Sequence, residues 1–206
     1  SGEPPSRTDL AALLSTLHQW TEQGWLRRLD SALAAFALER DPQASPVLLM
    51  ACALLAQMEG RGHSALPLAA LVASPQALLG WPEAAQSALQ QAWAALPSTV
   101  AGWVQALQAS AVVRWAGTAP SPQGTGAWLV LDGPTDAPLL YLQRYWAYEI
   151  QVAQALRDRA AQSQPVDPRA VQPWLVKLFG AASPDTPAAP DWQQLACALA
   201  LRGGVS

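Results

Sequence analysis

The chain has 206 residues, of which 51% are hydrophobic and 13% are charged, and its formal net charge is −3. This composition argues against intrinsic disorder, and no uninterrupted apolar run reaches the length of a membrane span. The lysines and arginines are scattered, which disfavours an autonomous nucleic-acid-binding role. Because the N-terminus carries no secretory signal, we expect a globular cytoplasmic protein without membrane attachment.

The first half of the chain carries several helix signals. A leucine repeat after Thr8 predicts an amphipathic helix that stops near Gly24, and a second helix is expected over residues 31–39. Ser45 and Pro46 provide an N-cap and a first-turn proline for a segment that is apolar on nearly every face. That segment is therefore expected to be a central, buried helix. Short helices should follow Pro67, Pro75 and Pro82, and another should span 98–109.

The pattern changes after residue 126. The segment "AWLVLDGPTDAPLLYLQRY" places two short apolar runs on either side of a turn, which predicts a β-hairpin. A hairpin alone is marginally stable, so it should pack on other elements. A helix with Tyr145, Tyr148, Val152 and Leu156 on one face should follow. A further helix from Asp167 contains Pro173, where we expect a kink or a restart.

The last part combines a proline-rich segment, 182–190, with a terminal helix. Asp191 suits the N-cap of that helix, Gln194 could reach back to the cap, and Gly203 suits its end. The expected fold is mainly α, with an N-terminal helical bundle followed by a β-hairpin and further helices. The expected domains are a helical interaction domain over 1–115, the hairpin plus helices over 116–181, and the linker with the terminal helix over 182–206.

No catalytic or metal site emerges from the motifs. A phosphate-binding P-loop needs a lysine after a glycine, and the only lysine, Lys177, follows a valine. Gly-Thr-Gly at 124–126 lacks the context of a dinucleotide site. His18 and His63 are too few for a zinc site, and Cys52 and Cys197 are expected to be free thiols in apolar helix patterns. A small-molecule enzyme built around His63 remains the remote alternative.

An unusual scarcity of charge marks the middle of the chain, because Arg114 is the only charged residue between positions 84 and 131. The core of a protein interface is depleted in charge, although a bias toward alanine would give the same pattern. The tryptophans divide into two groups. We expect the first group, Trp103, Trp146, Trp174 and Trp192, in or at the edge of the core. The second group lies at helix ends or in loops, where an aromatic can anchor a partner: Trp20, Trp25, Trp81 and Trp115.

Several segments resemble, in order, the N-terminal part of the bacterial RecD family, the alpha subunit of exodeoxyribonuclease V (RecBCD). They are "LDSALAAFAL", "LLAQMEGRGHSALPLAAL", "GWVQALQASAVV", "LVLDGPTDAPLLYLQRYWAYE" and "DWQQLACALAL". In that family the last helix directly precedes the strand and P-loop of the first motor domain. The resemblance thus implies that residues 182–206 hold the linker and first helix of a motor domain, and that the sequence stops one strand before the ATP site.

The resemblance also implies a function. The family's motor uses ATP and Mg to move 5′→3′ along single-stranded DNA, and it joins a RecC-like and a RecB-like subunit in double-strand break repair and recombination. A glutamine in the pattern Q-x-x-A reads adenine in such helicases, and Gln193 fits that pattern. We expect the 206 residues to be a non-catalytic assembly module that docks the motor on the RecC-like subunit. The alternative is a DNA-channel element that guides the strand with Arg144, Arg157 and Arg159.

Overall fold

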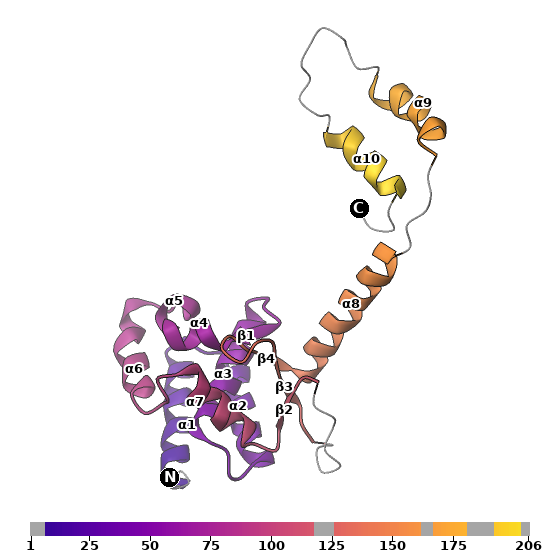
Figure 1. The fold of residues 1–206 in the computed structure, drawn as a ribbon. Coiled ribbons are helices and arrows are strands. Elements are labelled where there is room, and N and C mark those ends of the chain that lie inside the picture. Colours follow the sequence, from indigo (N-terminus) through magenta and orange to yellow (C-terminus); the bar gives the residue numbers. More distant parts are fainter. Residues whose placement is uncertain (1–6, 118–125, 162–166, 181–191, 203–206) are drawn as a thin grey trace. The chain divides into compact units, whose positions relative to one another are not determined.

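The structure is a computed structural model that describes residues 7–117, 126–161, 167–180 and 192–202. Its contacts divide the chain into two compact units, Ser1–Ala147 and Tyr148–Ser206, which are described separately. Figure 1 follows the elements along the chain and shows that helices dominate. The expected mainly α fold class is confirmed.

The first unit is built around one buried helix. This helix, α3 (Pro46–Gly60), begins at Ser45, whose hydroxyl accepts a hydrogen bond from the backbone N–H of Leu48 at 3.2 Å. Every residue from Val47 to Met58 is buried. Because all its faces are apolar, α3 must be covered on every side, and α1, α2, α7 and two strands pack against it. The prediction of a central, surrounded helix is confirmed.

The covering helices are short and close to the expected positions. Pro75 and Thr99 mark two of the starts, as the first residue of α5 and the N-cap of α7. Their bounds are α1 (Arg7–Glu22), α2 (Arg28–Arg40), α4 (Leu68–Ala73), α5 (Pro75–Leu79), α6 (Glu83–Trp93) and α7 (Val100–Gln108).

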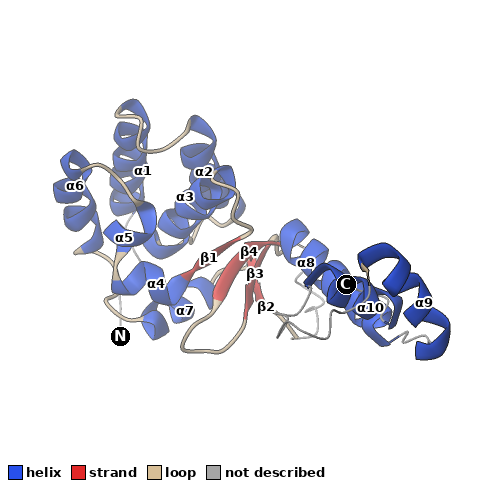
Figure 2. Cartoon of the chain, turned by 90° about the horizontal axis from the view of Figure 1, so that it is seen from above, coloured by secondary structure: helices blue, strands red, loops and turns tan. Residues whose placement is uncertain are grey.

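A four-stranded sheet completes the first unit, and Figure 2 shows its strands gathered beside the helices. The strands β3 (Leu129–Asp132) and β4 (Leu139–Leu142) pair antiparallel, so the predicted hairpin is confirmed. Two strands that the sequence did not reveal flank it. β1 (Ala65–Pro67) pairs antiparallel with β4, and β2 (Val113–Trp115) pairs parallel with β3. The hairpin thus packs with strands from the N-terminal segment as well as on α3.

The second unit contains most of α8 (Gln143–Ala161), together with α9 (Pro168–Phe179) and α10 (Trp192–Arg202). α9 runs without interruption through Pro173, so the expected restart is wrong. Pro173 has no N–H to donate to the carbonyl of Arg169, so α9 lacks one helical hydrogen bond in its exposed first turns, and the helix continues despite that loss. Residues 182–190, the cap Asp191 and Gly203 lie outside the described residues.

Three tryptophans differ from expectation. Trp20 is 2% exposed and belongs to the core, because it continues the leucine stripe of α1 one turn beyond Leu17. Trp174 and Trp192 are 63% and 70% exposed, because no described element covers those faces of α9 and α10. Trp103 is buried as predicted, and its indole N–H donates to the carbonyl oxygen of Pro97 at 2.9 Å.

A buried carboxylate holds the start of α2. Asp30 is fully buried and accepts hydrogen bonds from the backbone N–H of Arg27 at 2.7 Å and from its guanidinium at 3.0 and 2.7 Å. The same guanidinium donates to the carbonyl oxygen of Ala56 in α3. Gly60 leaves room for it, since a Cβ there would lie 2.0 Å from Arg27 Nη1. Arg27 and Asp30 therefore join the ends of α2 and α3.

Replacing Asp30 by alanine should lower the free energy of unfolding by about 2–3 kcal/mol, because the backbone and guanidinium donors of Arg27 lose their charged acceptor. Urea unfolding followed by circular dichroism measures this change. The exposed Glu39→Ala change on the same helix is the control and should shift stability by less than about 0.5 kcal/mol. Equal effects of the two changes would contradict a structural role for Asp30.

Candidate interaction surface

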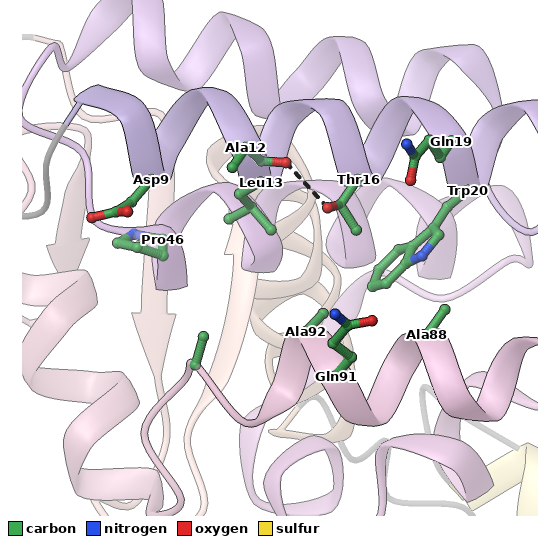
Figure 3. Close-up of a pocket in the computed structure, with 11 residues that line it drawn as sticks. Asp9, Ala12, Leu13, Thr16, Gln19, Trp20, Pro46, Ala88, Gln91 and Ala92 are labelled. Atoms are coloured by element: carbon green, nitrogen blue, oxygen red, sulfur yellow. Dashed lines mark hydrogen bonds between the residues drawn. The ribbon is translucent and has the colours of Figure 1, made fainter.

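A groove of about 560 Å³ runs between α1 and α6 (Figure 3). In Figure 3, Leu13, Thr16 and Trp20 extend from α1 toward α6, while Ala88 and Ala92 face them from α6. Asp9 is the only charged residue in the lining. The full lining consists of Asp9, Ala12, Leu13, Thr16, Gln19, Trp20, Pro46, Ala88, Gln91, Ala92 and Ala95.

The chemistry of this groove suits a protein segment. Leu13 and the alanines offer an apolar surface. Trp20 borders the groove but is almost fully buried, with its indole edge-to-face against Trp81 and the ring centroids 5.1 Å apart. Alanines on both walls allow another backbone to approach closely, and Thr16, Gln19 and Gln91 supply neutral hydrogen-bonding groups. An amphipathic helix or an extended segment with an uncharged face matches this combination.

The scarcity of charge extends from the groove over α6 and α7. Beneath this surface the rings of Trp93 and Trp103 contact each other at a tilt of 31°, with their centroids 5.4 Å apart, and help join the two helices to the core. Glu83, at the start of α6, is exposed and charged. The exposed positions after it carry alanine, glutamine and serine: Ala84, Gln86, Ser87, Gln90, Ala101, Gln105 and Gln108. The groove lining and these residues are together called the neutral face.

A second hollow, of about 600 Å³, lies between α1 and α2. Its rim carries His18 and Glu22 from α1 and Arg28 from α2. The hydroxyl of Thr21 donates to that of Ser31 at 3.2 Å across this interface. Within the described part of the chain, no cluster of three or more His, Cys, Asp or Glu side chains could hold a metal ion.

None of the other residues singled out from the sequence belongs to the lining of the groove. His63 is exposed in the turn after α3, and Gln193 is exposed on α10, where its role toward adenine stays a prediction. Arg157 and Arg159 are exposed on α8. Arg144 stacks on Tyr145, with its guanidinium carbon 4.7 Å from the ring centroid.

Both cysteines have reduced thiols. Burial in α3 raises the pKa of the Cys52 thiol well above its ordinary value, so this group stays protonated and behaves as a small apolar side chain. Cys197 is exposed on α10. The expectation of free thiols is confirmed, although an apolar environment holds only for Cys52.

Arg114, in β2, binds side chains in the first turn of α8 and has a structural role there. Its guanidinium donates two hydrogen bonds to Gln143 Oε1, at 3.0 and 2.7 Å, and lies 4.6 Å from the ring centroid of Trp146. The indole N–H of Trp146 in turn donates to Asp132 Oδ2 at 2.8 Å. Arg114 therefore connects β2 with α8. No sequence motif marks this role, because the partners come together only when the sheet forms.

A second set of contacts connects the first turn of α8 with Glu59 of α3. The phenol of Tyr145 donates to Glu59 Oε1 at 2.8 Å, and Glu59 Oε2 lies 3.6 Å from Arg27 Nη2. The hydrogen bond to Glu59, followed by desolvation of the phenol, raises the pKa of Tyr145 above its ordinary value. A raised pKa means that folding favours the protonated phenol.

The contribution of Tyr145 to stability should be complete at neutral pH and should disappear as the pH rises through its elevated pKa, above about 10. Tyr145→Phe lacks the bond to Glu59 at every pH, so its stability deficit relative to the wild type should shrink in that alkaline range. Urea unfolding between pH 7 and 11 measures the difference. The exposed Tyr148→Phe change is the control and should show a small, constant difference. A deficit for Tyr145→Phe that stays constant to pH 11 would contradict the bridge.

The first unit is thus a helical domain with a small sheet and a charge-poor outer face over α6 and α7. Residues 22–141 match the family described as "RecBCD enzyme subunit RecD, N-terminal domain". The match covers more than half of the chain and includes α2 to α7 and all four strands. The chain therefore belongs to the RecD N-terminal domain family, and the resemblance seen in the sequence is confirmed.

Two further findings accompany the family match. A search of curated proteins found no significant relative. Among the described residues, no helix combines the length and the apolar character needed to cross a membrane.

Proposed function

We propose that this chain is an assembly module that docks an ATP-driven 5′→3′ DNA motor on a RecC-like subunit of a RecBCD-type enzyme. The neutral face carries this proposal. Exposed surfaces of free proteins usually mix charges of both signs, whereas the core of a stable interface lacks them. The groove between α1 and α6 adds a concave seat to this face. The family, described as a domain of an enzyme subunit, supports an assembly role.

The catalytic parts of the proposed enzyme belong to the motor. ATP and Mg would bind there, and Gln193 would contact adenine only when a P-loop is present to hold the phosphates. The RecB-like subunit and single-stranded DNA are further proposed partners of the whole assembly in double-strand break repair and recombination. Within this chain the proposed chemistry is recognition of a protein surface.

A positive charge in the groove should disrupt docking. In the full subunit, co-expressed with its RecC-like and RecB-like partners, Ala12→Arg should weaken binding to the RecC-like subunit by about tenfold or more, because it buries an unpaired charge in the interface. Titration of purified subunits measures the affinity. Ala11→Arg is the matched control, since Ala11 is exposed on the same helix but does not line the groove. Unchanged affinity for both variants would remove the groove from the proposal.

The DNA-channel alternative relies on the exposed Arg144, Arg157 and Arg159 of α8. Under our proposal the 206-residue chain neither hydrolyses ATP nor binds single-stranded oligonucleotides tightly at physiological salt. Fluorescence anisotropy over a salt series tests the second point. A strongly salt-dependent affinity that is lost in Arg157→Ala and Arg159→Ala, but retained in the control Arg28→Ala, would favour the alternative.

A further inference from the structure

The helix α8 changes its surroundings at Ala147. Its first turn contacts β2, β3 and α3, whereas every residue from 148 to 161 is exposed except Ala153, which is partly exposed. Four of these exposed side chains are large and apolar: Tyr148, Ile150, Val152 and Leu156. Packing among the described residues therefore contributes little to the stability of the segment 148–161.

A helical segment of this length is marginally stable in water when nothing supports it. Isolated helices shorter than about 12–15 residues are marginal, because the first hydrogen-bonded turn must be ordered before further bonds are gained. The segment has one favourable local contact, in which the side-chain amide of Gln154 donates to Asp158 Oδ1 at 2.7 Å. Ile150 and Val152 are β-branched and have lower helix propensity. The local sequence thus leaves the segment near the balance between helix and coil.

The first turn of α8 supplies the ordered turn that such a segment needs. The backbone N–H of Gln143 donates to the carbonyl oxygen of Trp128 at 2.8 Å, so the residue before β3 satisfies one amide at the start of the helix. Side chains of the turn are also held by partners outside α8, in four contacts: Gln143–Arg114, Trp146–Arg114, Trp146–Asp132 and Tyr145–Glu59. These four side-chain contacts are called the clamp.

The clamp joins three elements that are far apart along the chain. Arg114 belongs to β2, Asp132 to β3 and Glu59 to α3, so the clamp is complete only when the sheet and the helices of the first unit have come together. The order of the first turn of α8 is therefore coupled to the folding of the first unit.

We propose that the clamp nucleates α8 and that the helix beyond Ala147 propagates from it. With the clamp closed, residues 148–161 form a helix of about 20 Å, at 1.5 Å per residue. With the clamp open, helix formation must start within the segment, with an initiation constant of about 10⁻³, and the segment becomes a flexible chain. The clamp is thus a conformational device that sets whether the chain leaves the first unit as a stiff helix or as a flexible connection. This inference does not depend on the proposed docking.

Hydrogen exchange followed by mass spectrometry measures this helix in the 206-residue chain. In the wild type, the backbone amides of residues 148–161 should exchange at least about tenfold more slowly than in an unstructured peptide of the same sequence. Arg114→Ala leaves the sequence of α8 unchanged and removes two hydrogen bonds and the contact with Trp146. It should accelerate the exchange of these amides about tenfold, while the amides of α1 keep their rates.

Tyr145→Phe is a second, milder variant. Tyrosine and phenylalanine have nearly equal helix propensities, so this change removes only the bond to Glu59 and should accelerate exchange in 148–161 about fivefold. Ser45→Ala is the matched control, because it removes the N-cap bond at the start of α3 and leaves the clamp intact. Exchange in 148–161 should be the same in this control as in the wild type. If Arg114→Ala does not fold, the comparison of Tyr145→Phe with Ser45→Ala carries the test.

A rescue experiment separates nucleation from packing. Ile150→Ala and Val152→Ala raise the helix propensity of the segment, and both side chains are exposed, so little packing is lost. Added together to Arg114→Ala, or to Tyr145→Phe if the former does not fold, they should restore most of the lost protection. Protection that is not restored would contradict nucleation as the role of the clamp.

Three exchange results would overturn the proposal. The first is exchange of 148–161 in the wild type at the rate of an unstructured peptide, and the second is wild-type exchange in the clamp variants that fold. The third is an equal acceleration in α1 and α3, because the clamp would then support the whole first unit instead of α8. None of these results bears on docking through the neutral face, which Ala12→Arg tests separately.

Discussion

The need to cover α3 on every side determines the arrangement of the first unit. Every side chain from Val47 to Met58 is buried, so this helix gains its stability only when other elements remove it from water. The sheet contributes through β1 and β4, and α1, α2 and α7 cover further faces. Each covering helix therefore packs one face on the core and exposes the opposite face. The bond network of Arg27 and Asp30 secures this packing where α2 meets the end of α3.

The solvent-facing sides of the covering helices carry different residue types. Apart from Glu83, α6 and α7 show mainly alanine and glutamine, and the groove between α6 and α1 has an apolar lining that includes Leu13 and Ala88. α2 shows an apolar stripe of Leu29, Leu33 and Phe36 on its outer side. The charged and aromatic groups at the start of α8, by contrast, are engaged with Asp132, Glu59 and Arg114. Uncharged and apolar side chains thus occupy much of the outer surface, while the polar clusters hold the domain together.

The candidate surface was only partly predictable. The scarcity of charge between 84 and 131 is visible in the sequence, and the structure places much of this segment on α6 and α7. The groove is not visible, because its walls come from α1 and α6, which are far apart along the chain. The stripe on α2 was not recognised either. Its spacing is that of an ordinary amphipathic helix, and only the burial of Asp30 on the opposite side shows that Leu29 and Phe36 face outward.

The sequence by itself determined the elements whose signals are local. These include the capped, apolar α3 and the hairpin of β3 and β4 with its proline-containing turn. The sequence also sufficed to recognise the RecD N-terminal family. Tertiary structure decided the rest. Strands of three residues such as β1 and β2 are too short to show an alternating pattern and form only because the hairpin offers backbone partners. Tertiary packing likewise placed Trp20 in the core and gave Arg114 its partners, because burial depends on which elements meet in space rather than on neighbours in the chain.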